Sequence, residues 1–146
     1  VQVWADKYGN VMYVGDRDCT LQRRNQKLIE IAPAPFVTSA QRERLRQYAV
    51  AVANAAGLDN VSTIEFLQDG DHFYFMEANT RLQVEHTISE EVSGIDLVMA
   101  MKNSSLGRPL PSTDTPTPMG YAVQLRVNAE SPNHNGEVLS TTGRVL

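Results

Sequence analysis

The sequence predicts a mixed α+β fold, and three observations carry this prediction. Short runs rich in β-branched and aromatic residues are separated by turn-forming residues, as in "VQVWADKYGNVMYVG", a pattern typical of strands in hairpins. One long segment instead repeats its apolar residues at three- and four-residue steps, the period of an amphipathic helix. Hairpin turns join antiparallel strands, so helices and antiparallel strands together give the α+β class.

The first elements expected are a hairpin over residues 1–18 and a helix over about residues 39–56. Thr38, followed by Gln41 three residues later, is a plausible capping box at the helix start. Gly57 is a natural stop at the helix end. The apolar stripe of this helix consists of Leu45, Tyr48, Ala49, Val52, Ala53 and Ala56.

A second hairpin is expected where "STIEFLQ" and "HFYFMEANT" flank "DGD". Two helical stretches follow, "TISEEVSG" and "IDLVMAMKNSSLG", which end at Gly94 and Gly107. A loop rich in proline and threonine spans residues 109–118, and the alternation in "GYAVQLRVNAE" predicts a further strand.

Composition bounds the class of protein. The chain has 146 residues, 42% of them hydrophobic and 21% charged, which is ordinary for one globular domain. A net charge of −4 argues against a nucleic-acid binder, and no apolar run approaches the roughly 20 residues of a membrane span. The single cysteine, Cys19, excludes an internal disulfide and is expected to be a small buried hydrophobe. Both chain ends look cut, so we expect an internal piece of a longer protein.

The second hairpin brings two carboxylates together. If its loop has three residues, Gly70 to His72, positions that sum to 142 lie opposite each other and Glu65 faces Glu77. Directly opposed side chains share a face, with Cβ atoms roughly 4.5–5.5 Å apart. A two-residue loop would instead make them diagonal neighbours on opposite faces. Two carboxylates that close repel each other unless a cation or a proton intervenes.

The same strand face presents further polar groups. Side chains in a strand alternate, so Glu77, Asn79 and Arg81 point one way, as does Gln83 if the strand runs on. Carboxylate and amide oxygens suit Mg²⁺ with bound phosphates, and an arginine beyond the metal can grip a planar anion. These are the parts of a phosphoryl-transfer site. A solvated cross-strand charge ladder would give the same pattern, and the pattern leaves both interpretations open.

Other polar residues also allow two interpretations. The basic cluster of Arg23, Arg24 and Lys27 indicates either an anionic ligand or a solvated loop. Arg126 lies among apolar residues of the last strand, so it is either on the outer face of a sheet or directed into a pocket. Of the histidines, His86 is expected to make a structural hydrogen bond. The other two, His72 and His134, are expected to be solvated.

The segments "FMEANTRLQVEHTISEEVSGIDLV", "RDCTLQRRNQK" and "VQLRVNAE" resemble biotin carboxylase, the ATP-grasp component of biotin-dependent carboxylases that act on acetyl-CoA, propionyl-CoA, pyruvate or urea. The Glu-x-Asn-x-Arg core is shared with other ATP-grasp enzymes, whereas "LQVEH" is typical of biotin carboxylase. The resemblance runs over about residues 1–132. It implies that residues 1–107 form the C-terminal half of an ATP-grasp domain, incomplete at its N-terminus. Residues 108–146 would begin the biotin carboxylase C-terminal domain.

The resemblance also implies a two-step reaction. Bicarbonate attacks the γ-phosphate of ATP to give carboxyphosphate, whose CO₂ then passes to N1′ of biotin on a carrier domain. The cofactors implied are ATP, Mg²⁺ or Mn²⁺, and biotin. The implied metal ligands are Glu65, Glu77 and Asn79. Arg81 would be the catalytic arginine that orients bicarbonate, and Glu85 the general base.

The remaining implied roles concern binding. The bicarbonate site would consist of Lys27, Arg81, Gln83 and the backbone N–H of Val84. Arg126 would stabilise the biotin enolate. ATP would contact Gln22, Asn25, Glu65 and Glu77, although many members of the family have histidine where this chain has Asn25.

The resemblance implies bicarbonate, a biotin carboxyl carrier domain and a carboxyltransferase part as partners, and a homo-oligomeric parent enzyme. Neither nucleic acid nor a membrane is expected as a partner, and the compartment implied is the cytoplasm or the mitochondrial matrix. Two other functions stay open: another ATP-grasp ligase, similar to carbamoyl-phosphate synthetase, or a non-catalytic interaction module. We expect the isolated piece to have no carboxylase activity.

Overall fold

A four-stranded antiparallel sheet forms the centre of the molecule in a computed structural model, which describes residues 1–135 and 137–143. The strand order is β2-β1-β5-β6, and all three pairings are antiparallel. Both expected hairpins are therefore confirmed. The strand bounds are β1 Gln2–Ala5, β2 Val11–Gly15, β5 Asn60–Asp69 and β6 His72–Asn79.

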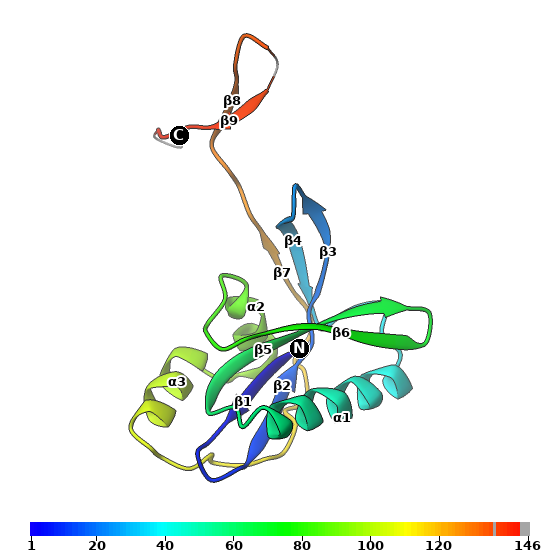
Figure 1. The fold of residues 1–146 in the computed structure, drawn as a ribbon, viewed down its shortest axis with the longest axis vertical. Helices are drawn as coiled ribbons and strands as arrows, with labels where there is room; N and C mark the ends of the chain where they lie inside the picture. The colour runs from blue at the N-terminus through cyan, green and yellow to red at the C-terminus, as the bar shows by residue number, and fades with distance from the viewer. Residues whose placement is uncertain (136, 144–146) are drawn as a thin grey trace.

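Helices cover both faces of this sheet. Successive side chains of its strands point to opposite faces, and both faces carry apolar residues that need to be buried. Helix α1 (Ser39–Ala55) packs Ala49 and Ala53 against Val3 and Ile64 on one face. Helix α3 (Leu97–Ser105) packs on the other face. The cluster on that second face contains Trp4, Met12, Val14, Val61, Leu97 and Ala100. Figure 1 shows α1 on one side of the sheet and α3 on the other.

The ends of the helices follow the local sequence. The capping box of α1 is confirmed: the Thr38 hydroxyl accepts from the N–H of Gln41, and the Gln41 side chain accepts from the N–H of Thr38. Helix α2 (His86–Ser93) ends at Gly94, whose φ of 71° is left-handed. Left-handed backbone costs glycine little, because it has no Cβ. The helix expectations are therefore confirmed, and the class is α+β.

A second, three-stranded sheet contains a hairpin that the sequence analysis did not predict. Strands β3 (Asp18–Arg23) and β4 (Gln26–Ala32) pair antiparallel, and β7 (Ala122–Leu125) pairs with the other edge of β4. The turn between β3 and β4 is Arg24-Asn25, with φ of 51° and 63°. Two left-handed residues in a two-residue hairpin loop are usually Asn-Gly or Asp-Gly, so this turn lacks the usual glycine signal.

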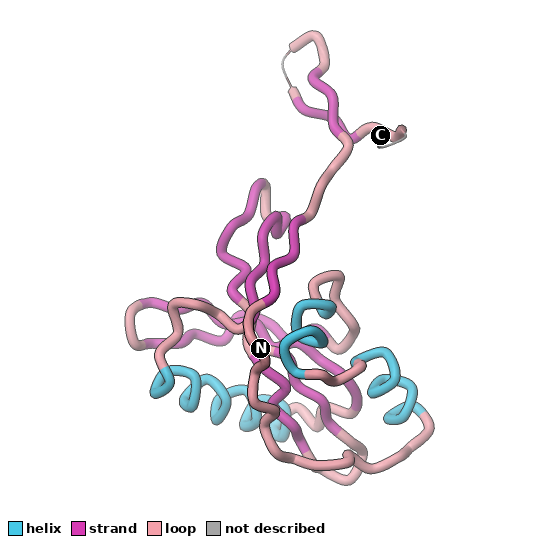
Figure 2. Tube along the Cα trace, turned by 180° about the vertical axis from the view of Figure 1, so that it is seen from behind, coloured by secondary structure: helices cyan, strands magenta, loops and turns pink. Residues whose placement is uncertain are grey.

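The small sheet stands out from the central one, and the chain continues beyond it (Figure 2). β7, which follows residue 108, pairs with β4, which precedes it, so the expected parts 1–107 and 108–146 share one sheet. The boundary between these parts stays a prediction, and residues 144–146 lie outside the described residues. The last two strands, β8 (Glu130–Pro132) and β9 (Val138–Ser140), pair with each other. None of the helices in the described part of the chain is long and apolar enough to cross a membrane.

Candidate functional site

The pairing of Glu65 with Glu77 is confirmed, but by a different route from the one expected. The β5–β6 loop has two residues, Gly70 and Asp71, so the three-residue loop was wrong. Near the loop the paired positions sum to 141, as in Phe66 opposite Phe75. A bulge at Met76 then inserts one residue, and from Glu65 opposite Glu77 onward the sum is 142. The bulge therefore restores the register that the shorter loop would have shifted.

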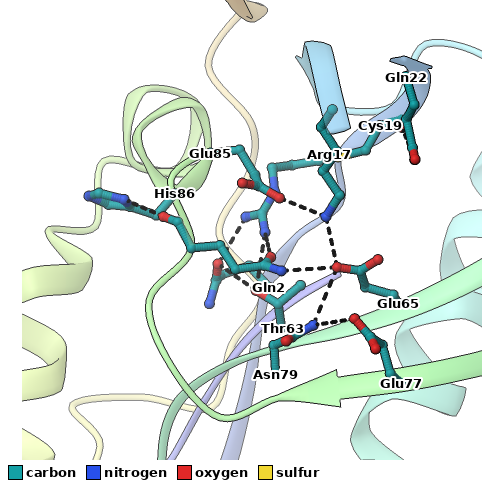
Figure 3. A network of polar contacts seen from close by, with 12 residues as sticks. Gln2, Arg17, Cys19, Gln22, Thr63, Glu65, Glu77, Asn79, Glu85 and His86 are labelled. Carbon is teal, nitrogen blue, oxygen red and sulfur yellow. Dashed lines mark hydrogen bonds and ion pairs between the residues drawn. The ribbon is translucent and has the colours of Figure 1, made fainter. Parts of the chain in front are cut away.

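Glu65 lies at the centre of a network of donors. Its Oε1 accepts from Lys27 Nζ at 2.7 Å, from Gln83 Nε2 at 2.9 Å and from Asn79 Nδ2 at 3.4 Å. Asn79 Nδ2 also donates to Glu77 Oε1 at 2.9 Å, so one amide joins the two carboxylates (Figure 3). Partial burial would raise the pKa of Glu65, but the bonds from Lys27 and Gln83 lower it below its ordinary value.

Lys27 links this carboxylate to a second, buried one. Its Nζ lies 2.7 Å from Oε1 of Glu65 and 2.7 Å from Oε1 of Glu85, whose side chain is only 3% exposed. Burial alone would raise the pKa of Glu85, but Lys27 holds it below its usual range. The pKa of Lys27 is in turn raised, because its two carboxylate partners outweigh the effect of burial. At neutral pH the cluster is therefore an ionised carboxylate–ammonium–carboxylate bridge.

Arg126 is directed into this cluster rather than onto the outer face of its sheet. Its guanidinium lies 3.8 Å from Oε2 of Glu85, and its side chain is 25% exposed, whereas the neighbouring Val123 and Leu125 are more exposed. The Thr87 hydroxyl donates to Gln124 Oε1 at 2.8 Å and fixes the first turn of α2 against β7. That contact keeps Glu85, just before α2, beside Arg126.

The strand does not run on to Gln83, and it ends before Arg81, which was expected to lie on it. β6 ends at Asn79, and a turn follows before α2 begins at His86. Gln83 and Glu85 are nevertheless buried, because the turn folds back over the sheet. Arg81 remains exposed, and its guanidinium donates to the carbonyl of Leu82 at 3.3 Å.

Not all of the predicted bicarbonate-binding residues and residues of the basic cluster lie in the site. The Val84 side chain is exposed. Of the basic cluster, only Lys27 joins the site, since Arg23 pairs with Glu130 and Arg24 is exposed in the β3–β4 turn. His86 makes the expected structural contact, with Nδ1 2.7 Å from the carbonyl of Gln83.

A cavity of about 370 Å³ opens between the β3–β4 and β5–β6 hairpins. Gln22 and Glu65, two of the expected ATP contacts, line it, together with apolar residues of β5 and β6 such as Leu67 and Phe73. Asn25, in the hairpin turn, and Glu77 are outside its lining. Half-buried Cys19 also lines the cavity, and burial raises the pKa of its thiol, so the thiolate is disfavoured.

Sequence reasoning missed two residues that border the site. Arg17 donates to side chains of β1 and β5 (Figure 3). It also donates to side chains of the turn before α2 and of α2 itself. Glu30, on β4, is fully buried, and neither carboxylate oxygen has a hydrogen-bond partner among the described residues. Arg17 gave no local signal, because "GDRD" resembles an ordinary polar turn. Glu30 could have been found only from its position within β4, a strand that was not predicted.

The donor set fits a hard divalent cation only with ligands from outside the protein. No group of three or more His, Cys, Asp or Glu residues in the described ranges has a metal-binding arrangement. Glu65 and Glu77 are opposed across two strands, and in the part of the chain described here Oε2 of each takes part in no hydrogen bond. Mg²⁺ usually takes one or two carboxylates and completes its shell with waters and phosphates, so the two carboxylates fit it.

Comparison with known proteins gives a consistent set of matches. The family model described as "Carbamoyl-phosphate synthase L chain, ATP binding domain" matches residues 1–113. The chain is 47% identical over 147 residues to the mitochondrial propionyl-CoA carboxylase alpha chain of Caenorhabditis elegans, covering 99% of this chain and 20% of the relative.

Solved structures give the same picture. A biotin carboxylase complex from Campylobacter jejuni superposes with a TM-score of 0.86 at 46% identity, covering 92% of this chain and 30% of that one. The biotin carboxylase domain of Hydrogenobacter thermophilus 2-oxoglutarate carboxylase, in complex with MgADP, ADP and bicarbonate, superposes with a TM-score of 0.83 at 43% identity. That match covers 88% of this chain and 29% of the other. The chain therefore spans only about a fifth to a third of the proteins it matches.

Proposed function

Since this chain belongs to the carbamoyl-phosphate synthase L chain ATP-binding domain family and has biotin carboxylases among its relatives, we propose that it supplies the metal- and bicarbonate-binding part of a biotin carboxylase. The longer protein would use ATP and bicarbonate to carboxylate biotin on a carrier domain. The observation that carries this proposal is the Lys27 bridge, which joins Glu65 on the sheet to Glu85 beside Arg126. A solvated charge ladder would have no reason to bury Glu85 so deeply.

Glu65, Glu77 and Asn79 would hold Mg²⁺ or Mn²⁺. The cation would neutralise phosphate charge and align ATP for attack. In this role the paired carboxylates contribute hard oxygen ligands from two adjacent strands, and Asn79 reaches both of them. Gln22 would contact the nucleotide from the rim of the 370 Å³ cavity that Glu65 also lines, and Asn25 from the adjacent turn.

Bicarbonate would bind among Lys27, Arg81, Gln83 and the backbone N–H of Val84. Glu85 would take its proton, because this carboxylate is ionised at neutral pH and lies beside Lys27, whose ammonium would draw the anion to it. The freed oxygen attacks the γ-phosphorus, the bond to the ADP oxygen breaks, and carboxyphosphate forms. Decomposition of carboxyphosphate releases CO₂ and phosphate. The phosphate would take the proton from N1′ of biotin, and the biotin enolate so formed would attack the CO₂. Arg126 would stabilise this biotin enolate, since its guanidinium already faces the cluster.

The proposal extends to partners and compartment. A carrier domain bearing biotin, a carboxyltransferase part and a homo-oligomeric assembly would belong to the complete enzyme. The relative from Caenorhabditis elegans is described as mitochondrial, which supports the mitochondrial matrix as one compartment and leaves the cytoplasm as the other. The family model's name supports one competing function, a carbamoyl-phosphate synthase-like ligase.

The test is biotin-dependent ATP hydrolysis by the full-length protein and by its Glu85→Gln variant. Loss of a general base is expected to lower kcat about 10²–10⁴-fold. Glu91→Gln is the matched control, because Glu91 is exposed on α2 near the site but not in the cluster. Activity that requires ammonia or glutamine and ignores biotin would instead support the synthase-like ligase. An unaltered Glu85→Gln enzyme would contradict the role of Glu85.

A further inference from the structure

Arg17 makes more side-chain hydrogen bonds than a structural arginine in a turn requires. Its NH1 donates to Gln2 Oε1 at 2.9 Å and to Ser89 Oγ at 2.7 Å. Its NH2 donates to Thr63 Oγ1 at 3.1 Å and to Gln83 Oε1 at 3.1 Å. All four acceptors are neutral, although burying a guanidinium without a bonded carboxylate is costly.

The bond to Gln83 determines which end of its amide faces the site. A guanidinium has only donors, so the amide must turn its oxygen toward Arg17. The Nε2 group then points the opposite way, and it donates to Glu65 Oε1 at 2.9 Å. We propose that Arg17 is a positioning residue that holds Gln83 with its N–H directed into the bicarbonate site. This inference rests on the proposed function and adds a residue to it.

The bond to Glu65 requires the same orientation of the Gln83 amide, but Glu65 cannot hold that orientation in every state of the site. Glu65 is a ligand of the metal in the proposed function, so its contact with Gln83 depends on what is bound. Arg17 has no such second role. It is fixed by Gln2 on β1, Thr63 on β5 and Ser89 on α2, three elements of the packed core. An anion in place of the Glu65 contact would therefore still meet the N–H and not the carbonyl oxygen of Gln83.

The location of Gln83 explains why such an anchor is needed. Gln83 lies in the turn between β6 and α2, with no regular backbone ladder to fix it. Its side chain is buried, and its carbonyl is also held, by Nδ1 of His86 at 2.7 Å. Arg17 therefore anchors the side chain of a residue whose own segment is neither helix nor strand, and it does so without touching the substrate.

The test is a double-mutant cycle in the full-length carboxylase, read as KM for bicarbonate. Gln83→Ala removes the amide, and loss of one hydrogen bond to a charged ligand is expected to raise this KM about tenfold. Arg17→Met should raise it by a similar factor and leave KM for ATP unchanged. The double variant should be no worse than Gln83→Ala alone, because Arg17 acts through Gln83.

Ser89→Ala is the matched control, since it removes another Arg17 partner without touching Gln83, and its KM for bicarbonate should stay within about twofold of wild type.

Additive effects in the double variant, or a raised KM for ATP in Arg17→Met, would overturn the inference. If Arg17→Met does not fold, Arg17→Lys closes the same cycle, because lysine keeps the charge but cannot span the four acceptors. An unchanged KM in Gln83→Ala would overturn the assignment of Gln83 as well. A raised KM in Gln83→Ala with an unchanged one in the folded Arg17 variants would overturn only the positioning role.

Discussion

At the scale of single residues, Glu30 is the most unusual group in the molecule. It is fully buried on β4, and no described residue donates to either of its oxygens. Burial raises the pKa of its carboxyl, and the charge of Glu85 raises it further, against the smaller effects of Arg126 and Lys27. The charged form of this carboxyl is therefore disfavoured beside the ionised cluster, and this costs stability wherever the unfolded carboxyl is ionised.

Glu30→Met is expected to stabilise the protein, by about 1–3 kcal/mol at pH 8, because it removes an unpaired buried polar group. The gain should shrink toward pH 4. A carboxyl whose pKa is higher in the folded than in the unfolded protein lowers the free energy of unfolding only at pH values where the unfolded carboxyl is ionised. This loss of stability begins near the pKa of the unfolded state and grows until the pH passes the pKa of the folded state. Denaturant titrations of the protein at several pH values measure this. Equal gains at pH 4 and pH 8, or a loss at pH 8, would contradict the account.

At the scale of elements, α1 supports the hairpin that carries the site. The Gln41 side chain closes the capping box and also donates to Gly70 O at 3.2 Å and to Asp71 Oδ1 at 2.8 Å. The start of α1 is thereby tied to the tip of the β5–β6 hairpin. A local sequence signal, the capping box, thus also anchors a long-range contact.

Thr38→Ala is expected to cost about 1 kcal/mol of stability, because it removes the hydroxyl that accepts from the N–H of Gln41. Chemical denaturation of the two proteins side by side measures the difference. The neighbouring Ser39→Ala should leave the free energy of unfolding unchanged within about 0.5 kcal/mol, since Ser39 is exposed and lies inside the helix. A Thr38→Ala protein as stable as wild type would mean that Gln41's contacts with the hairpin tip replace the cap.

Elements marked by local chemistry could be predicted, and those set by distant packing could not. Thr38 and Gly57 mark the start and the end of helix α1 in the sequence, and both ends were predicted correctly. The β3–β4 hairpin was missed because its turn, Arg24-Asn25, uses no glycine. The pairing of Glu65 with Glu77 was right although its loop was wrong, because the bulge at Met76 compensated for the shorter loop.

The candidate site divides in the same way. The hairpin pairing and the alternation of "EANTR" pointed to Glu65, Glu77, Asn79 and Arg81, and the basic cluster offered Lys27 as one possible anion ligand. A resemblance to a known family added Glu85 and the specific roles. Neither pattern nor resemblance identified Arg17, whose acceptors come from four separate parts of the chain. The bridge between Glu65 and Glu85 depends on the fold of a turn, which sequence periodicity does not encode.

At the scale of the whole molecule, the chain spans only about a fifth to a third of the proteins it matches. The cavity between the β3–β4 and β5–β6 hairpins would form one side of the nucleotide site in the proposed function. Phosphoryl transfer requires the nucleotide to be enclosed and its charges neutralised from several sides.

The chain of 146 residues on its own is therefore expected to show no biotin-dependent ATP hydrolysis above background. Phosphate release with ATP, Mg²⁺, bicarbonate and free biotin measures it, with the full-length protein as the positive control. A circular dichroism spectrum with the expected helix and strand content ensures that inactivity is not simply unfolding. Turnover by the folded chain would contradict the expectation and would mean that the clamp on the nucleotide is dispensable.

The Lys27 bridge has a consequence for the order in which ligands arrive. Lys27 neutralises Glu65 only while no divalent cation does so, and a cation on Glu65 would compete with the ammonium for the same oxygen. The displaced ammonium would then be free to attract an anion beside Glu85. Cation and anion would in that way assist each other's binding, and by linkage each would tighten the other by the same factor. Either ligand alone would therefore bind more weakly than the two together, because it would have to compete with or displace the Lys27 bridge without the other's help.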